Sequence, residues 1–281
     1  MGKPSLKCDR NRLRKLPVFH LGDYRRLRHT QNCTQFSITV FKWRFLRSSY
    51  MNLKDKKVLI TGGSEGLGLS LAKVLVEKGC LVNIAARNAG KLKAASDSIN
   101  SINLKTFLCD VSDFKSVNEL ATEIGSIDIL INNAGIWTEG NVVDNKYEDI
   151  QSVINTNLLG TLYVTKAFLP VMIKKNRGFV INVSSTAGLT GRQNFSVYSA
   201  SKWGVKGFTE SLKLDLAKTG IKVIGFYPGG MNTAMYEKAG FSKDVSKWMN
   251  TDEVARYLVY ILENSDSFLI DHTVVNRPKP S

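Results

Sequence analysis

Short apolar runs alternate with stretches of helical periodicity along most of the chain. The runs at residues 58–60 and 81–85 lie on either side of residues 66–78, where leucines and valines recur every three or four positions. That spacing predicts an amphipathic helix, whereas a short unbroken apolar run predicts a buried strand. Gly79 then supplies a residue that readily takes the left-handed conformation in which helices end. The domain is therefore predicted to open with a strand, a helix and a second strand.

The same alternation continues toward the carboxyl end. Further strands are expected at residues 106–109, 127–131, 179–183 and 222–226, with long helices at residues 147–175 and 198–218. Strands separated by helices of this length form βαβ units, which build a parallel sheet covered by helices on both faces. Residues 51–281 are therefore predicted to form a single α/β domain, a doubly wound Rossmann-like fold with a mostly parallel sheet.

Composition adds one unusual property, a strong excess of positive charge. The 281 residues include 39 Lys or Arg against 24 Asp or Glu, for a formal net charge of +15. Residues 1–50 contain 12 of these cations but only two acids, Asp9 and Asp23. Such a segment would suit a nucleic-acid- or membrane-binding arm, an Arg-rich transit peptide, or an extension too poor in packable apolar residues to fold. We favour a disordered extension or a start codon chosen too far upstream, because Met51 begins a typical domain.

Cysteine and histidine spacing gives no sign of a disulfide framework or a metal site. The four cysteines include no Cys-x-x-Cys pair, and the three histidines do not recur at ligand spacing. No uninterrupted apolar run has the length of a membrane helix, and no secretory signal is found. We expect reduced cysteines, no bound metal and a cytoplasmic location.

A glycine-rich turn joins the first predicted strand to the first predicted helix. It comprises Gly62, Gly63, Ser64, Glu65, Gly66, Leu67 and Gly68, with the spacing G-x-x-x-G-x-G. Glycines allow the backbone to approach a pyrophosphate, and the following helix presents N–H groups and the positive end of its dipole. A tight connection without a ligand is the alternative. The position between a strand and a helix favours dinucleotide binding.

The ends of the second and third predicted strands affect the choice of cofactor. An NAD site usually places an acid after the second strand, to bind the ribose 2′-hydroxyl, whereas this chain has Ala86 and then Arg87. A guanidinium group suits a 2′-phosphate, so we predict a preference for NADP(H) over NAD(H); a solvated turn residue is the alternative. Asp110 could accept a hydrogen bond from the adenine amino group, cap the helix that starts near Ser112, or do both.

Tyr198 and Lys202 are four residues apart on a predicted helix, so their side chains share one face. Ser185 precedes them at the end of a predicted strand. A phenol has a pKa near 10, and lowering it by about three units takes roughly 4 kcal/mol. A neighbouring ammonium group and a positive nicotinamide ring both favour the tyrosinate. The Tyr-x-x-x-Lys pair is common by chance, but after a strand-end serine and a glycine-rich turn it indicates a proton-transfer site.

Together these motifs resemble the short-chain dehydrogenase/reductase family over residues 53–276. The matching segments, in the family's order, are residues 61–68, Asp110-Val111, Asn132-Asn133-Ala134-Gly135, Asn157, Ser185, Tyr198 with Lys202, and Pro228-Gly229. The resemblance implies an NAD(P)-dependent oxidoreductase that interconverts a carbonyl and an alcohol. Family members usually begin near the position of Met51, so the basic segment is the departure.

The resemblance also implies roles for single residues. Tyr198 would exchange a proton with the reacting oxygen, which Ser185 would hold in place. Lys202 would bind the nicotinamide ribose and lower the pKa of the tyrosine, and Asn157 would hold a water that links Lys202 to solvent. The residues that we expect to contact the cofactor are Gly62, Ser64, Glu65, Gly66, Leu67, Gly68, Arg87, Asp110, Val111, Asn133, Ala134, Gly135, Tyr198, Lys202, Pro228, Gly229 and Thr233.

The sequence does not name the substrate. Four aromatics either border the substrate pocket or belong to the core or an interface: Trp137, Phe195, Trp203 and Tyr236. Residues 231–250 correspond to the family's substrate loop, and the two long helices resemble those with which the family forms homodimers and homotetramers. The alternative function is a cofactor sensor or scaffold without turnover, against which the intact Asn–Ser–Tyr–Lys set argues. Nucleic-acid or membrane binding through residues 1–50 would be an added function.

Overall fold

The computed structural model describes residues 50–238 and 244–277. The predicted basic extension lies outside the described residues except for Tyr50, as do residues 239–243 of the predicted substrate loop. The division of the chain into an extension and a domain starting at Met51 therefore stays a prediction.

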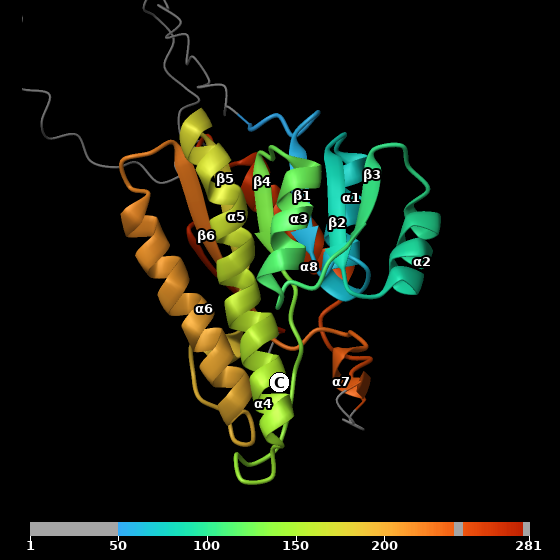
Figure 1. Ribbon diagram of the computed structural model, residues 1–281, viewed down its shortest axis with the longest axis vertical. Helices are drawn as coiled ribbons and strands as arrows, with labels where there is room; N and C mark the ends of the chain where they lie inside the picture. Colours follow the sequence, from blue (N-terminus) through green and yellow to red (C-terminus); the bar gives the residue numbers. More distant parts are fainter. Residues whose placement is uncertain (1–49, 239–243, 278–281) are drawn as a thin grey trace, which may run out of the picture. The chain divides into compact units, whose positions relative to one another are not determined.

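The described residues form a parallel sheet of seven strands in the order β3-β2-β1-β4-β5-β6-β7 (Figure 1). The strands are β1 Lys57–Thr61, β2 Leu81–Ala86, β3 Leu104–Leu108, β4 Ile129–Asn132, β5 Gly178–Val183, β6 Ile221–Pro228 and β7 His272–Val275. The order reverses between β1 and β4, and ligands of such sheets bind beside this switch point, at the carboxyl ends of the strands. The doubly wound parallel fold predicted from the sequence is confirmed.

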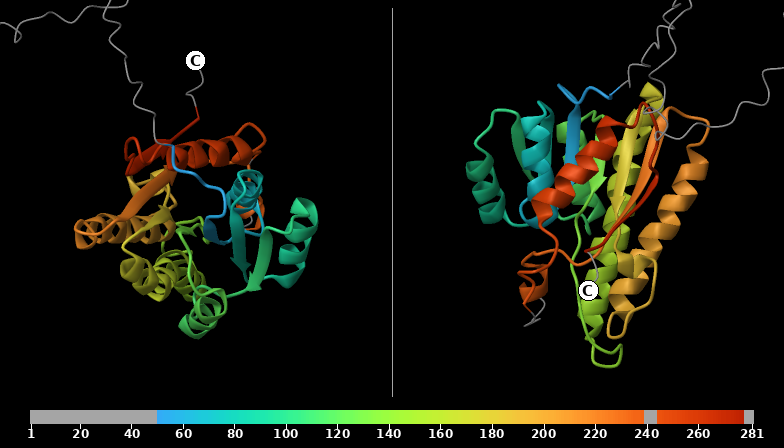
Figure 2. Two further views of the ribbon diagram at one scale, coloured as in Figure 1. Left: turned by 90° about the horizontal axis from the view of Figure 1, so that it is seen from above. Right: turned by 180° about the vertical axis from the view of Figure 1, so that it is seen from behind.

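Helices cover both faces of this sheet (Figures 1 and 2). Val58 and Ile60 face a core shared with α1, α2 and α8, whereas Leu59 faces a core shared with α3, α5 and α6. The strands are buried on both sides, which is why their sequences are continuous apolar runs. The helices are α1 Gly66–Glu77, α2 Ala89–Ile99, α3 Phe114–Ile124, α4 Tyr147–Ile154, α5 Gly160–Lys175, α6 Ser196–Asp215, α7 Met235–Lys238 and α8 Thr251–Glu263.

The helix predicted at residues 147–175 is one helical run with a change of pitch. A π-helical turn, Asn155–Leu159, lies between α4 and α5. By length and composition alone this run, Tyr147–Lys175, could cross a membrane, although 44% of its most apolar window is buried inside the protein. Its inner face packs on the sheet, as expected of a core helix that is long and apolar enough to resemble a membrane span.

The chain is anchored just before β1. The backbone N–H of Met51 donates to the carbonyl oxygen of Glu263 at 2.7 Å, and the side chains of Met51 and Leu53 are buried in the core that includes α8. Residues 51–53 thus belong to the folded structure although they precede the first strand.

Near the carboxyl end of β6, Tyr227 lies back over Gly225. A Cβ atom placed on Gly225 would be 2.5 Å from the hydroxyl oxygen of Tyr227, so a side chain there would collide with the ring. The ring also stacks on His272 of the edge strand β7, with a centroid distance of 4.4 Å. Tyr227 therefore fills the space beside the edge strand, directly before Pro228 and Gly229.

Candidate active site

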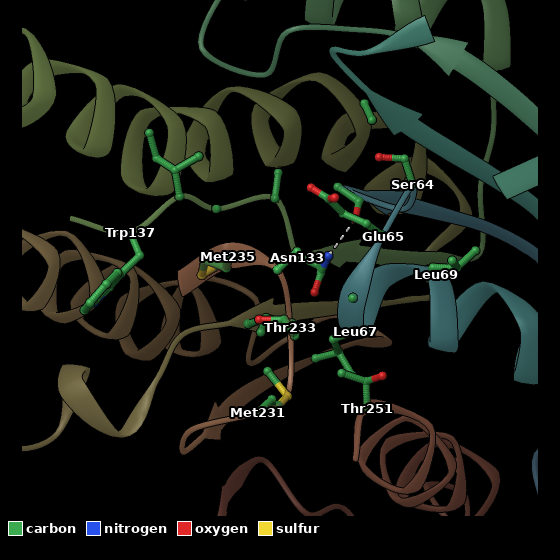
Figure 3. Close-up of a pocket in the computed structure, with 18 of the residues that line it drawn as sticks. Ser64, Glu65, Leu67, Leu69, Asn133, Trp137, Met231, Thr233, Met235 and Thr251 are labelled. Carbon is green, nitrogen blue, oxygen red and sulfur yellow. Dashed lines mark hydrogen bonds between the residues drawn. The ribbon is translucent and has the colours of Figure 1, made fainter. Parts of the chain in front are cut away.

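A cleft of about 950 Å³ opens at the carboxyl ends of the central strands, beside the switch point (Figure 3). Its walls come from the turn after β1, the ends of β2, β4, β5 and β6, and the start of α6. Ser64 and Glu65 lie at one end of the cleft and Trp137 lies at the other (Figure 3). The cleft therefore has two distinct ends.

The glycine-rich turn is locked to the segment that follows β4. Gly62 and Gly66 have φ angles of +65° and +54°, which side chains rarely adopt. A Cβ atom on Gly62 would lie 2.8 Å from the Cα atom of Ala134. The side-chain amide of Asn133 donates to the carbonyl oxygens of Thr61 and Gly62 at 3.0 and 3.1 Å. These contacts need the small residues and shape a backbone cradle at the N-terminus of α1.

Two ion pairs lie at this end of the cleft. Arg87 Nη1 is 4.0 Å from Asp110 Oδ2, and Lys91 Nζ is 3.0 Å from Glu65 Oε2. Asp110 does not cap α3, because the helix begins at Phe114 and the side chain of Asp113 accepts the hydrogen bond from the first turn. The helix-capping role considered for Asp110 is therefore wrong.

The Tyr-x-x-x-Lys pair lies near the middle of the cleft, on the first turns of α6. Lys202 Nζ donates to the carbonyl oxygen of Val183 at 3.0 Å and lies 5.8 Å from the ring centroid of Tyr198. Ser185, which follows β5, lies close enough to Tyr198 to affect the acidity of its phenol. A Cβ atom on Gly135 would be 3.5 Å from Lys202 Nζ, an ordinary contact distance, so Gly135 lies next to the ammonium group.

Burial changes the acidity of both groups. It raises the pKa of Tyr198, against a smaller opposing effect of the Ser185 hydroxyl and of the charge on Arg192. Burial also lowers the pKa of Lys202 to about 8. The phenol is thus protonated at neutral pH in the protein alone, and the ammonium group is close to titration. Such a pair can donate a proton to an oxygen bound beside it.

Asn157 lies in the π-helical turn and binds the segment after β4. Its side-chain oxygen accepts from the N–H of Ile136 at 2.8 Å, and its amide donates to the carbonyl oxygen of Ile136 at 2.9 Å and to Ser201 Oγ at 3.0 Å. Asn157 therefore satisfies both backbone groups of Ile136.

Comparisons with known proteins decide the family. The family model described as short chain dehydrogenase matches residues 56–243. The chain belongs to the short-chain dehydrogenase family. It is accordingly an oxidoreductase, of a family that uses a nicotinamide cofactor.

Similar proteins span the same part of this short-chain dehydrogenase. An uncharacterised oxidoreductase of Staphylococcus aureus is 33% identical over 230 residues, covering 80% of this chain and 98% of that protein. The human 3-oxoacyl-[acyl-carrier-protein] reductase is 35% identical over 230 residues, covering 79% and 96%. A solved serine dehydrogenase complexed with NADP+ has a TM-score of 0.72 and 26% identity, covering 79% and 94%. An actinorhodin polyketide ketoreductase with NADPH has a TM-score of 0.72 and 28% identity, covering 79% and 96%.

Most residues that the sequence singled out lie around the cleft of this short-chain dehydrogenase. Of the expected catalytic and cofactor-binding residues, three do not line it directly: Gly68, Asp110 and Asn157. Gly68 packs against the carbonyl oxygen of Gly62 and supports the cradle from behind. The lining residues among those expected are Gly62, Ser64, Glu65, Gly66, Leu67, Arg87, Val111, Asn133, Ala134, Gly135, Ser185, Tyr198, Lys202, Pro228, Gly229 and Thr233. Among the described residues, no group of three or more His, Cys, Asp or Glu could hold a metal.

Aromatic side chains from four segments form what we call the aromatic wall, beside Tyr198. Successive ring centroids are 4.8 Å apart from Trp248 to Tyr236, 5.1 Å from Tyr236 to Trp137, 5.3 Å from Trp137 to Phe195 and 6.5 Å from Phe195 to Tyr198. All four contacts are edge-to-face. Trp203 does not take part, because it is 44% exposed and packs under Lys206. Sequence reasoning missed Trp248, which only the fold brings to this place.

A buried polar network behind the cleft was also missed. The amide nitrogen of Asn132 donates to Asn182 Oδ1 at 2.8 Å and to Thr165 Oγ1 of α5 at 2.9 Å. The amide nitrogen of Asn182 donates in turn to Thr209 Oγ1 of α6 at 2.9 Å. The four side chains are buried and connect β4 and β5 to the two helices that extend from the site. The sequence feature that could have predicted this network is an Asn at or next to the last position of two predicted strands.

Proposed function

We propose that this enzyme transfers a hydride between NADP(H) and a carbonyl or secondary alcohol, with Tyr198 as the general acid and base. The observation that carries the proposal is the convergence of Ser185, Tyr198 and Lys202 in a cleft whose far end is a glycine cradle. A buried phenol that holds its proton at neutral pH suits the donation of that proton to a carbonyl oxygen.

The residues of the cradle fit a dinucleotide. A Cβ atom at Gly62 would collide with Ala134, and one at Gly68 would collide with the carbonyl oxygen of Gly62, so the cradle that presents the N-terminus of α1 to a pyrophosphate needs both glycines. The cofactor, when bound, supplies the hydride acceptor or donor. In the proposal Asn133, Ala134 and Gly135 border its ribose, and Pro228, Gly229 and Thr233 border the nicotinamide.

The remaining roles follow from position. Ser185 would hold the reacting oxygen through its hydroxyl, beside the phenol of Tyr198, which lines the same cleft. Lys202 would bind the nicotinamide ribose and favour the tyrosinate by its charge. Asn157, one residue shell away, would hold a water next to Lys202, because its side-chain oxygen and the ammonium group both lie beside Gly135.

Support for NADP(H) comes from Arg87 and Lys91, which line the end of the cleft where the adenosine would lie. Both cations are paired with carboxylates, Asp110 and Glu65, and could turn to a 2′-phosphate, for which a guanidinium group is a strong bidentate donor.

A homodimer or homotetramer is part of the proposal. An apolar groove between α5 and α6, lined by Leu169, Ile173 and Phe208 among others, fits a second copy. Light scattering of the purified protein tests this, and a monomer at micromolar concentration contradicts it. The cytoplasmic location is also proposed: Cys80 and Cys109 are free and buried, as expected in a reducing compartment.

The test of the function is Tyr198→Phe, which removes the proton donor and keeps the ring. We expect NADPH binding to stay within about threefold and carbonyl reduction to fall by about 10²–10⁴-fold. Oxidation of NADPH is followed by its absorbance over a panel of aldehydes and ketones. Turnover that survives the substitution excludes Tyr198 as the acid.

A further inference from the structure

The two ends of the cleft differ sharply in charge. The charged lining side chains Glu65, Arg87 and Lys91 follow β1 and β2, and Lys73 belongs to α1. Asp252 adjoins Thr251, whose hydroxyl oxygen accepts from Ser70 of α1 at 2.9 Å. Glu65, whose carboxylate pairs with Lys91, lies at the end of the cleft away from Trp137, where the adenosine and pyrophosphate would lie (Figure 3).

The opposite end is formed by uncharged side chains. Among the described residues that line it are Trp137, Met235 and Tyr236 (Figure 3). Trp137 is only 6% exposed, held between Phe195 and Tyr236. Rings and thioethers form a surface that favours flat, polarisable, apolar ligands.

Two cations lie close to the aromatic wall, and each is already engaged outside it. Arg192 is exposed, and its guanidinium group donates to Thr186 Oγ1 at 2.8 Å. Arg277 lies over the ring of Trp248, 5.2 Å from its centroid. Burial raises the pKa of Tyr236 as well as that of Tyr198, and the positive charge of Arg192 acts against both increases. Among the described residues, the cations near the wall other than Lys202 are exposed, so a carboxylate bound against Trp137 would lose its water without forming a buried ion pair there.

We propose that the substrates are uncharged carbonyl compounds with a planar ring, such as aryl aldehydes and ketones, whose ring packs against Trp137 and Tyr236. This inference rests on the proposed function. The carbonyl carbon accepts the hydride from NADPH, its oxygen takes the phenolic proton of Tyr198, and solvent returns that proton. The products are the aryl alcohol and NADP+. Substrates with a carboxylate at the ring end, and small aliphatic carbonyls, are disfavoured.

The experiment compares compounds matched in shape. 4-Methylbenzaldehyde and 4-carboxybenzaldehyde differ mainly in charge, and propanal lacks the ring. With the full chain and saturating NADPH we expect kcat/KM for 4-methylbenzaldehyde to exceed that for each of the other two by about 100-fold. A ratio near one, or a preference for the carboxylate, overturns the inference while leaving the hydride-transfer function intact.

Variants locate the effect on the wall. Trp137→Ala is expected to raise KM for 4-methylbenzaldehyde by about tenfold and to leave the Kd of NADPH within about threefold. Trp203→Ala, which removes the same side chain from the exposed face of α6, is the matched control and should change neither value. If Trp137→Ala does not fold, Tyr236→Leu replaces it with the same expected outcome. Equal effects of Trp137→Ala and Trp203→Ala contradict the assignment.

Failure of the proposed function can be told apart from failure of this inference. If no carbonyl is reduced, the proposed function is wrong, and the site is then tested by quenching of tryptophan fluorescence in the NADP+-saturated protein. Tighter binding of 4-methylbenzaldehyde than of 4-carboxybenzaldehyde, lost in Trp137→Ala, supports the apolar aromatic site. Equal binding, or tighter binding of the charged compound, overturns it.

Discussion

Lys202 places a cation where the protein gives it little hydration. Its side chain is 4% exposed, and the carbonyl oxygen of Val183 is its hydrogen-bond partner at 3.0 Å. Burial holds its pKa at about 8, below the ordinary 10.5. The free-energy cost of burying this charge can be measured without any substrate.

Lys202→Met shows this cost as a dependence on pH. Between about pH 8 and 10.5 the unfolded chain holds a proton that the folded protein has lost, so the contribution of Lys202 to stability rises with pH across this window. Below pH 8 both states are protonated and the contribution is least favourable. We expect the stability difference, Lys202→Met minus the natural protein, to decrease by about 2 kcal/mol from pH 7 to pH 10. Urea unfolding at each pH measures it, and a constant difference contradicts the buried charge.

Arg87 is the residue on which the cofactor preference depends. A hydrogen bond to a charged group contributes about 1.5–3 kcal/mol, so Arg87→Ala is expected to weaken NADPH binding by about 10–100-fold and NADH binding by about twofold at most. Calorimetric titration measures both affinities. Lys93→Ala removes a charge that pairs with Asp97 on the outer part of α2, and serves as the control. Equal losses of both cofactors would show that Arg87 does not read the 2′-phosphate.

At the scale of elements, the buried network ties the sheet to the helices that extend from the site. Asn182 precedes Val183, whose carbonyl oxygen holds Lys202, and it also binds Thr209 two turns further along α6. Asn132 donates to the hydroxyl oxygen of Thr165, which in turn donates to the carbonyl oxygen of Thr161. The hydroxyl of Thr161 donates to the carbonyl oxygen of Asn157. The two strand-end amides therefore set where α5 and α6 lie along β4 and β5.

Asn182→Leu tests whether this network positions the catalytic pair. The substitution removes the amide while keeping similar bulk, so α6 is expected to shift slightly against β5. A displacement of about 1 Å can cost about 10²-fold in rate, so we expect a loss of this size in kcat with the Kd of NADPH within about threefold. Asn83→Leu is the control. Asn83 donates to the carbonyl oxygen of Val58 within the pair of strands β1 and β2, away from Tyr198 and Lys202. If both variants lose kcat equally at equal loss of stability, the network is structural only.

The elements show how far sequence reasoning reaches. Continuous apolar runs predicted β1, β2, β4, β5 and β6, because both faces of these strands are buried. The third strand was predicted to begin two residues late. β3 is an edge strand whose three central residues are exposed or half-exposed, so it lacks a continuous apolar run. α2 and β7 were not predicted, since their patterns are half polar or short. α8 was also missed, although its apolar residues recur at helical spacing. The π-helical turn leaves no mark that periodicity could detect.

The site divides in the same way. Tyr198 and Lys202 could be paired from the sequence because one helix fixes their spacing. The aromatic wall and the Asn132–Asn182 pair depend on strand order and loop paths, which bring together residues up to about a hundred positions apart. No local pattern contains that information.

For the whole molecule, the start of the folded domain is a measurable boundary. Met51 and Leu53 are buried, and each contributes about 1.5–3 kcal/mol by leaving water. A chain that begins at Met51 is expected to melt within a few degrees of the full chain, whereas one that begins at Lys54 should melt well below it. Circular dichroism measures both. A large loss of stability in the chain that begins at Met51 would show that residues 1–50 are part of the fold and that the predicted boundary is wrong.

The contact between Gly225 and Tyr227 has a consequence for how such enzymes diverge. The ring of Tyr227 occupies the space beside the edge strand, and a side chain at position 225 would need that same space. Neither residue can therefore drift alone without a steric penalty. Across descendants of a common ancestor, we expect the two positions to change as a pair: glycine inherited with a large aromatic, or a larger residue at 225 with a small one at 227.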